Sequence, residues 1–173
     1  KTLEAFARLA DEYGDATLTI VGIGEMEQAL RARIAELHLE SRVTLTGGLP
    51  HEEVLRRMAQ SDLFVLQSCG EGYGIVYIEA MAAGCIAVGA ENEGIADTIT
   101  DGENGFLVPA GDTDAVERVM RAVFAHPEAY EALRARGMRD ARELTWAHNA
   151  EITAGVYREA MEHWRKEHAQ AGH

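Results

Sequence analysis

The sequence has few cysteines, few basic residues and no long apolar run, and each shortage excludes a class of protein. Its two cysteines, Cys69 and Cys85, form no C-x-x-C pair, so we expect reduced thiols in a cytosolic protein. Sixteen Lys and Arg accompany 29 Asp and Glu, which argues against a nucleic-acid partner. No apolar run has the length of a membrane span. We therefore expect a cytoplasmic protein, with peripheral attachment at the inner membrane face left open because the substrate could be a lipid.

Two motifs associated with cofactors are incomplete or have another explanation. The stretch "TIVGIGEM" begins like a dinucleotide fingerprint at Gly22 and Gly24, but Glu27 stands where the third glycine belongs. A tight strand-to-helix turn that lines a ligand is the preferred interpretation. The D-x-D of "GDTD" directly precedes a helical run, so helix capping explains Asp112 and Asp114 better than a metal does.

The histidines and cysteines indicate no metal centre and no nucleophile. The seven histidines are scattered, and His51, after a proline and before "EEVLRRM", is interpreted as a helix-start residue. Cys69 lies in a small-residue loop with no histidine nearby in the sequence, so it is expected to pack rather than react. We expect neither a metal nor another cofactor.

Short apolar runs alternate with helical patterns, which predicts an α/β fold with a doubly wound, Rossmann-like parallel sheet. The predicted strands are Thr17–Val21, Val43–Thr46, Leu63–Leu66, Ile86–Gly89 and Phe106–Val108. The predicted helices are Thr2–Tyr13, Glu25–Leu37, Glu52–Gln60, Ile75–Ala83, Gly94–Thr100, Asp114–Ala125, Glu128–Glu143 and His148–His168. We assign residues 1–144 to this domain and residues 145–173 to a C-terminal helix.

The sequence opens directly on a helix, "KTLEAFARLA", whereas a doubly wound domain normally begins with a central strand. We therefore expect the first strand of the sheet to be lacking from this chain. Its place would be between Thr17–Val21 and Leu63–Leu66, and an empty place there would expose two strand edges. Exposed edges favour association, so a homo-oligomer is one expected state.

The stretch "SCGEGYGIVYIEAMAAG" holds the main candidate site. Its helix, Ile75–Ala83, is apolar on nearly every side and is predicted to be buried all round, yet it carries Glu79. The glycines of the preceding loop permit close approach of a ligand, and the helix N-terminus offers amides to an anion. A phosphate at the helix tip and a diol against Glu79 describe a nucleotide. The alternative is a buried glutamate satisfied by backbone amides or by a protein cation.

Several segments together resemble the family 4 retaining glycosyltransferases. "EGYGIVYIEAMAAG" is similar to their two-glutamate signature, with Glu71 and Glu79 eight residues apart. The other similar segments, in the family's order, are "TIVGIGEMEQAL", "RVTLTGGLPHEEVLRRMAQSDLFVLQS", "ENEGIADTITDGENGFLVPAGD" and "LTWAHNAEITAGVYREAM". The resemblance implies one half of a GT-B fold, the donor-nucleotide half, with the C-terminal helix packing toward an N-terminal half that holds a sugar or lipid-linked acceptor. The stretch "EGIA", where the family more usually has Gly-Gly-Ile-Pro, resembles a subgroup active in bacterial surface polysaccharide synthesis.

The resemblance also implies roles for individual residues. Glu71 would be the catalytic residue at the donor sugar, and Glu79 would accept the ribose hydroxyls. The backbone of Gly72, Tyr73, Gly74, Ile75 and Val76 would lie along the sugar and diphosphate, Gly22 and Gly24 would border the nucleotide, and Val43, in the segment 42–47, would approach the base.

The family neutralises the departing diphosphate without a metal, through a helix N-terminus and a basic pair. Lys1 is too close to the first helix to be the expected lysine, so this pair is expected to be absent. The resemblance therefore implies a glycosyltransferase donor domain for a nucleotide-diphosphate sugar such as a UDP-sugar, incomplete for catalysis on its own. The alternative is a nucleotide-sugar binding or regulatory module without turnover.

Overall fold

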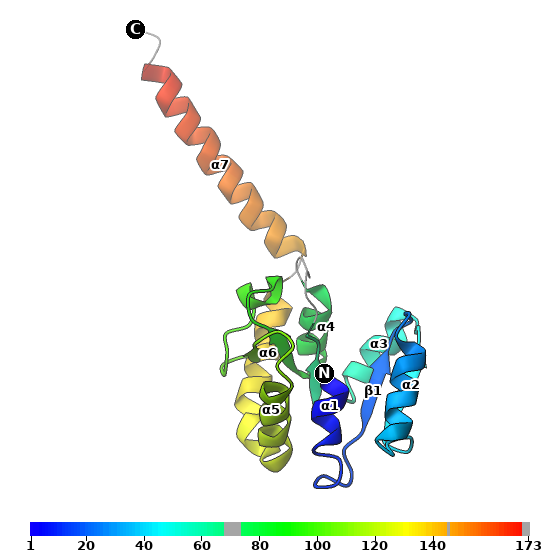
Figure 1. Cartoon of the computed structure of the whole chain (residues 1–173). Coiled ribbons are helices and arrows are strands. Elements are labelled where there is room, and N and C mark those ends of the chain that lie inside the picture. The colour runs from blue at the N-terminus through cyan, green and yellow to red at the C-terminus, as the bar shows by residue number, and fades with distance from the viewer. Residues whose placement is uncertain (68–73, 145, 171–173) are drawn as a thin grey trace.

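The structure is a computed structural model that describes residues 1–67, 74–144 and 146–170. In these ranges, parallel strands alternate with helices in a Rossmann-like α/β arrangement (Figure 1). The strands are β1 (Leu18–Val21), β2 (Val43–Gly47), β3 (Leu63–Val65), β4 (Ile86–Ala90) and β5 (Phe106–Val108). The α-helices are α1 (Thr2–Ala7), α2 (Glu27–Glu36), α3 (His51–Met58), α4 (Ile75–Ala83), α5 (Thr113–Ala125), α6 (Glu131–Glu143) and α7 (Trp146–Gln170).

The strands form two hydrogen-bonded sheets rather than one. β1 pairs with β2, with Leu18 opposite Val43, while β3, β4 and β5 form a second parallel sheet in that order. The α/β class with parallel pairing is confirmed. In the described part of the chain, β1 and β3 each have one paired neighbour, and the break between them falls where the sequence analysis placed a further strand.

Helix α1 joins the two sheets through its apolar side chains. Leu3 and Phe6 of α1, with Leu9 of the turn that follows, are buried in one cluster with residues of both sheets and of α5. From the β1–β2 side the cluster includes Val43, and from the β4–β5 side it includes Val88. Figure 1 accordingly shows α1 between β1 and α5. The described strands of the two sheets share no hydrogen bonds, so the packing of α1 is what connects the sheets.

Polar contacts fix the same helix to the β1–β2 half. The Arg33 guanidinium on α2 donates to both carboxylate oxygens of Glu4, at 2.7 and 2.9 Å. The Arg42 guanidinium donates to the carbonyl of Ala16 at 2.8 Å and to that of Tyr13 at 2.7 Å, so it holds the turn between α1 and β1.

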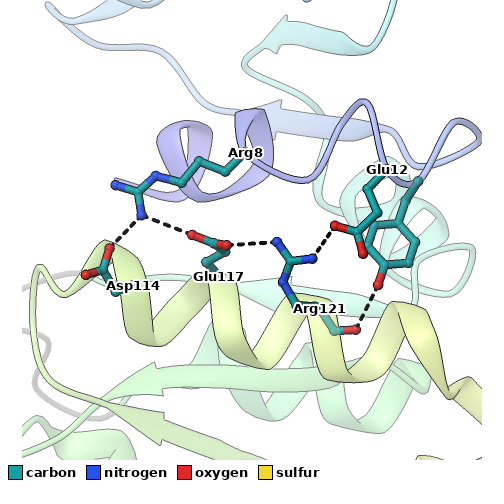
Figure 2. A network of polar contacts seen from close by, with 6 residues as sticks. Arg8, Glu12, Asp114, Glu117 and Arg121 are labelled. Atoms are coloured by element: carbon teal, nitrogen blue, oxygen red, sulfur yellow. Dashed lines mark hydrogen bonds and ion pairs between the residues drawn. The ribbon is translucent and has the colours of Figure 1, made fainter.

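An ion-pair network fixes α1 and the following turn to α5 on the other side (Figure 2). Arg8 contacts Asp114 and also Glu117, the latter at 3.0 Å. Arg121 contacts Glu117 at 3.0 Å and also pairs with Glu12. The hydrogen bonds from Arg121 and Arg8 hold the pKa of the Glu117 carboxyl below its ordinary value. α1 is thus bound by charge on both flanks of its apolar face.

Several predicted helices differ from the observed ones at their ends. The first helix ends at Ala7 rather than Tyr13 and continues as turns. The segment after β4 is a short 3₁₀ helix, Gly94–Asp97, and the segment Pro127–Tyr130 forms a second 3₁₀ helix before α6. Because this 3₁₀ helix takes up the first residues of the predicted helix Glu128–Glu143, α6 begins later than predicted, at Glu131. None of the described helices has the length and apolar character needed to cross a bilayer.

The packing of α1 generates a stability prediction. Phe6 is 1% exposed, so Phe6→Ala removes a buried ring from the cluster that joins the sheets. We expect the free energy of unfolding to fall by about 3–5 kcal/mol, measured by urea denaturation, with Phe6→Leu losing less. Met161→Ala, at a residue 54% exposed on α7, is the control. A Phe6→Ala protein as stable as the parent would show that α1 does not hold the sheets together.

The network on α5 generates a pH prediction. The ordinary pKa of the Glu117 carboxyl is 4.5, and folding lowers it. Such a carboxyl stabilises the folded state at pH values above its ordinary pKa, and this stabilisation is lost as the pH falls through the lowered pKa of the folded state. The free energy of unfolding should therefore decline on acidification below about pH 5, and the decline should be shallower in Glu117→Gln. Glu128→Gln, at an exposed glutamate outside the network, should follow the parent. Identical acid profiles for parent and Glu117→Gln would contradict the assignment.

Candidate functional site

Helix α4 begins and ends where the sequence predicts, because a glycine with positive φ stands at each end. Gly74 has φ +69°, and a Cβ there would lie 2.9 Å from Cδ2 of Tyr77. Gly84 has φ +101° and closes the other end. The fully buried Tyr77 donates its hydroxyl to the carbonyl of Leu66 at 2.6 Å. This bond fixes the start of α4 against the carboxyl end of β3.

The faces of α4 differ in exposure, so the prediction that this helix is buried all round is wrong. Tyr77, Ala80 and Met81 are fully buried, whereas Ile75 is 53% exposed and the side chain of Glu79 is 28% exposed. Only the first face packs on the core, because β4, α3 and α6 contact α4 and leave its other side accessible. Glu79 therefore sits on the accessible side, where a ligand can reach its carboxylate.

The carboxylate of Glu79 contacts a side chain from the neighbouring strand–helix connection. Nε2 of His51, the first residue of α3, lies 3.4 Å from Oε1 of Glu79. The imidazole is 66% exposed, so the pair lies at the surface of the carboxyl-end edge rather than inside the core. The contact forms an ion pair when the imidazole is protonated.

The turn between β1 and α2 forms a cavity at the same edge. Gly22 has φ +140°, in the region that favours glycine, and its N–H donates to the carbonyl of Gly47 at 2.9 Å. The cavity has a volume of about 170 Å³. Its lining residues are Ile20, Gly22, Ile23, Gly24, Met26, Glu27, Leu30, Leu45 and Gly47. Among the described residues, the lining is largely apolar and Glu27 is its one charged residue, so it suits the flat face of a ring better than an anion.

The predicted site residues fall into three groups. Gly22 and Gly24 line the cavity, as the interpretation of a ligand-lining turn requires. Gly74, Ile75, Val76 and Glu79 lie together on the first two turns of α4 or directly before it. Val43 is 6% exposed and lies at the amino end of β2, in the core cluster. On that strand Leu45 and Gly47, not Val43, line the cavity, because the carboxyl end of a parallel strand faces the ligand edge.

The remaining predicted residues, Glu71, Gly72 and Tyr73, lie outside the described residues, and so does Cys69. The other cysteine, Cys85, is buried, and burial raises the pKa of its thiol to about 11. Its Sγ donates to the carbonyl of Met58 at 3.0 Å, so Cys85 serves packing rather than reaction.

The described residues contain no group of three or more His, Cys, Asp or Glu side chains arranged for a metal ion. The predicted cap of α5 is confirmed, since the Asp112 carboxylate accepts from the N–H of Ala115 at 2.9 Å. Asp114 pairs with Arg8 instead of facing Asp112 in a shared site. The D-x-D stretch thus has a structural role at the start of α5.

Sequence reasoning did not identify three residues at this edge. His51 was interpreted only as a helix-start residue, although consecutive strand–helix connections meet at one edge of a parallel sheet. That rule gives the signal that could have placed it near the start of α4. Ile23 is 82% exposed and Met26 is 66% exposed beside the cavity. Two large apolar side chains exposed in a glycine turn are a second signal of a ligand surface.

Comparison with known proteins gives the family. Residues 1–140 match the model of the glycosyl transferases group 1 family. The amylovoran biosynthesis glycosyltransferase AmsK of Erwinia amylovora is 35% identical over 124 residues, covering 68% of this chain and 30% of that protein. A GDP-mannose-dependent phosphatidylinositol monomannoside mannosyltransferase of Mycolicibacterium smegmatis is 31% identical over 142 residues. The match covers 78% of this chain and 37% of that protein.

The solved structures include Anabaena HepE in complex with UDP-glucose, with a TM-score of 0.78 and 24% identity over 91% of this chain and 44% of that one. At this identity the likeness shows the fold alone. The chain spans less than half the length of each of these relatives. The family model covers most of the chain, and the chain therefore belongs to the glycosyl transferases group 1 family.

Proposed function

We propose that this chain is the donor-binding domain of a family 4 retaining glycosyltransferase, a hexosyltransferase that takes a nucleoside-diphosphate sugar. The observation that carries the proposal is the position of Glu79. Its carboxylate is partly exposed on the second turn of α4, at the edge where the strands end, in a helix that has no other charged residue. A carboxylate at this depth binds a diol well, because it accepts from both hydroxyls at once.

The other roles follow from the order of groups along a nucleotide-sugar. The first amides of α4, near Gly74, Ile75 and Val76, would receive the diphosphate at the positive end of the helix dipole. Glu71, with the backbone of Gly72 and Tyr73, would bind the sugar beyond the diphosphate. We propose that the α4 N-terminus takes the place of a metal, so that binding is independent of divalent ions.

The apolar cavity at Gly22 and Gly24 would receive the base. Its small volume and lining of Ile23, Met26 and Leu30 fit stacking against one face of a ring rather than full enclosure. The name of one relative specifies GDP-mannose and one similar solved structure is a complex with UDP-glucose, so we propose testing both uridine and guanosine donors.

A binding or regulatory module without turnover is the second candidate. It is favoured by α4 itself, where the diphosphate would lie, because that helix carries Glu79 and no Lys or Arg. An enzyme that releases a nucleoside diphosphate needs positive charge near the leaving group. Sugar transfer measured with and without a separately supplied acceptor-binding half separates the two candidates, because a module without turnover stays inactive in both assays.

We propose that the acceptor, a sugar or a lipid-linked sugar, is bound by a second half-domain against which α7 packs. α7 extends away from the rest of the molecule in Figure 1. Tyr157, Met161 and Trp164 are 67%, 54% and 60% exposed and recur at positions i, i+4 and i+7 of one helical face. An apolar stripe of this kind is typical of a helix that docks on another surface.

The role of Glu79 gives a binding prediction. Because a hydrogen bond to a charged group is worth about 1.5–3 kcal/mol, Glu79→Ala should weaken the binding of UDP or GDP about tenfold or more. Glu71→Ala should act mainly on the intact UDP- or GDP-sugar. The measurement is titration calorimetry in EDTA, which should leave the binding by the parent unchanged.

Glu128→Ala is the matched control for this experiment, since Glu128 is also a glutamate that contacts a histidine but lies far along the chain at an exposed position. It should bind as the parent does. Unchanged UDP and GDP affinities in Glu79→Ala, with measurable binding by the parent, would refute the ribose role. Loss of binding in EDTA would refute the metal-free mechanism.

Within the described residues, β1 and β3 each have one unpaired edge, and these edges give a second prediction. We propose that a further parallel strand fits between them, and that the chain alone is weakly stable or associates through these edges. Joining an apolar strand and a loop with an Arg–Lys pair ahead of Lys1 should raise both the melting temperature and the nucleotide affinity. A matched version with proline in the middle of the added strand should raise neither, because proline cannot complete the ladder.

Light scattering of the 173-residue chain provides the independent check. A compact and stable monomer that transfers sugar as well as the extended chain would show that the two sheets need no strand between them. If the version with proline raises the melting temperature as much as the version without it, the added length rather than strand pairing causes the increase.

A further inference from the structure

His51 and Glu79 form a contact that the proposed roles do not use. His51 opens α3, and its Nε2 lies 3.4 Å from Oε1 of Glu79 on α4. The imidazole is more exposed than the carboxylate, at 66% against 28%. Within the part of the chain that the structure describes, the second carboxylate oxygen of Glu79 remains available as an acceptor for another partner.

The packing of the two helices determines this contact. α3 and α4 share a cluster around Met58, Ala80 and Cys85. Val54 of α3 and Val76 of α4 pack against it, so the helices cannot slide past one another without disturbing buried side chains. The first residue of α3 is therefore held beside the second turn of α4 by the core rather than by a mobile loop.

The other charged residues of α3 are engaged with one another. Glu53 pairs with Arg56 and with Arg57, the latter at 3.2 Å, and Glu52 contacts Arg56 at 3.4 Å. Glu79 is the single charged residue of α4. Among the described residues of α3 and α4, the side chain that contacts the Glu79 carboxylate is therefore that of His51.

A glutamate on a half-exposed helix face samples several rotamers, and binding a ligand through it costs the entropy of fixing them. A second contact that fixes the carboxylate in advance lowers this cost. We propose that His51 is a positioning residue: it holds Oε1 of Glu79 so that the carboxylate faces the ribose diol of the bound nucleoside diphosphate. The proposal rests on the proposed function, which assigns the ribose to Glu79.

The test compares a nucleotide with its 2′-deoxy form, because only the first offers a complete diol. Titration calorimetry of the whole chain with UDP and dUDP, and with GDP and dGDP, gives a ribose preference for each variant. We expect the parent to prefer the ribonucleotide about tenfold. His51→Ala should reduce this preference severalfold by weakening the ribonucleotide alone, and Glu79→Gln should reduce it at least as much.

Two further variants separate positioning from folding. His51→Gln places an amide near the position of the ring nitrogen and should restore most of the preference. His126→Ala removes a histidine with a similar glutamate contact, 3.7 Å from Glu128, at an exposed position after α5, and should leave the preference unchanged. Equal melting temperatures of the parent and His51→Ala would show that the variant is folded as stably as the parent, so that a change in affinity does not come from unfolding.

Each result decides one proposal. If Glu79→Gln loses the preference and His51→Ala keeps it, the positioning role of His51 is refuted while the ribose role of Glu79 stands. If His51→Ala weakens ribo- and deoxyribonucleotides equally, or if His51→Gln fails to rescue, His51 has only a structural role and the inference is refuted. If the parent shows no ribose preference, or Glu79→Gln retains it, the ribose assignment fails and the inference fails with it.

Discussion

The apolar face of α1 is the constraint on which the rest of the structure depends, because the two sheets share no strand pairing in the described residues. Leu3, Phe6 and Leu9 occupy the common core, and Arg33 and Arg121 bind the same segment by charge from α2 and α5. Dispersion and hydrophobic burial are non-directional, so such a joint fixes position less sharply than a ladder of hydrogen bonds does. The relative placement of the sheets therefore depends on how well one short helix packs.

The packing of α1 between the sheets matters for the site because residues from both sheets form the ligand surface. The cavity at Gly22 and Gly47 belongs to the β1–β2 sheet, whereas Glu79 follows the strand β3 of the other sheet. His51 comes from the connection after β2 and reaches Glu79 across the break between the sheets. A nucleotide that contacts the cavity and Glu79 together would link the two sheets, so ligand binding and the stability of the joint are expected to reinforce each other.

Local signals in the sequence predicted the fold better than they predicted the surroundings of each element. The bounds of α4 were correct because Gly74 and Gly84 stop the helix at both ends, and the Asp112 cap was correct because capping is a short-range interaction. The exposure of Glu79 was predicted wrongly because burial depends on which elements cover a helix, and composition alone does not give that. His51 was missed for the same reason, since its contact joins residues 28 positions apart.

Some residues in the segments that resemble the family support the fold rather than the chemistry. Asn104 in "DGENGFLV" is 4% exposed; its side chain accepts from the N–H of Thr100 at 2.8 Å and donates to Asp140 at 2.9 Å. A Cβ on Gly137 of α6 would lie 2.6 Å from the Asn104 carbonyl, so glycine there lets the helix approach this loop. Similarity in that segment therefore reports the docking of α6, which also packs on α4. The donor site therefore rests on Glu79 with its neighbours and on the cavity at Gly22, whereas the segment around Asn104 positions α6 against α4.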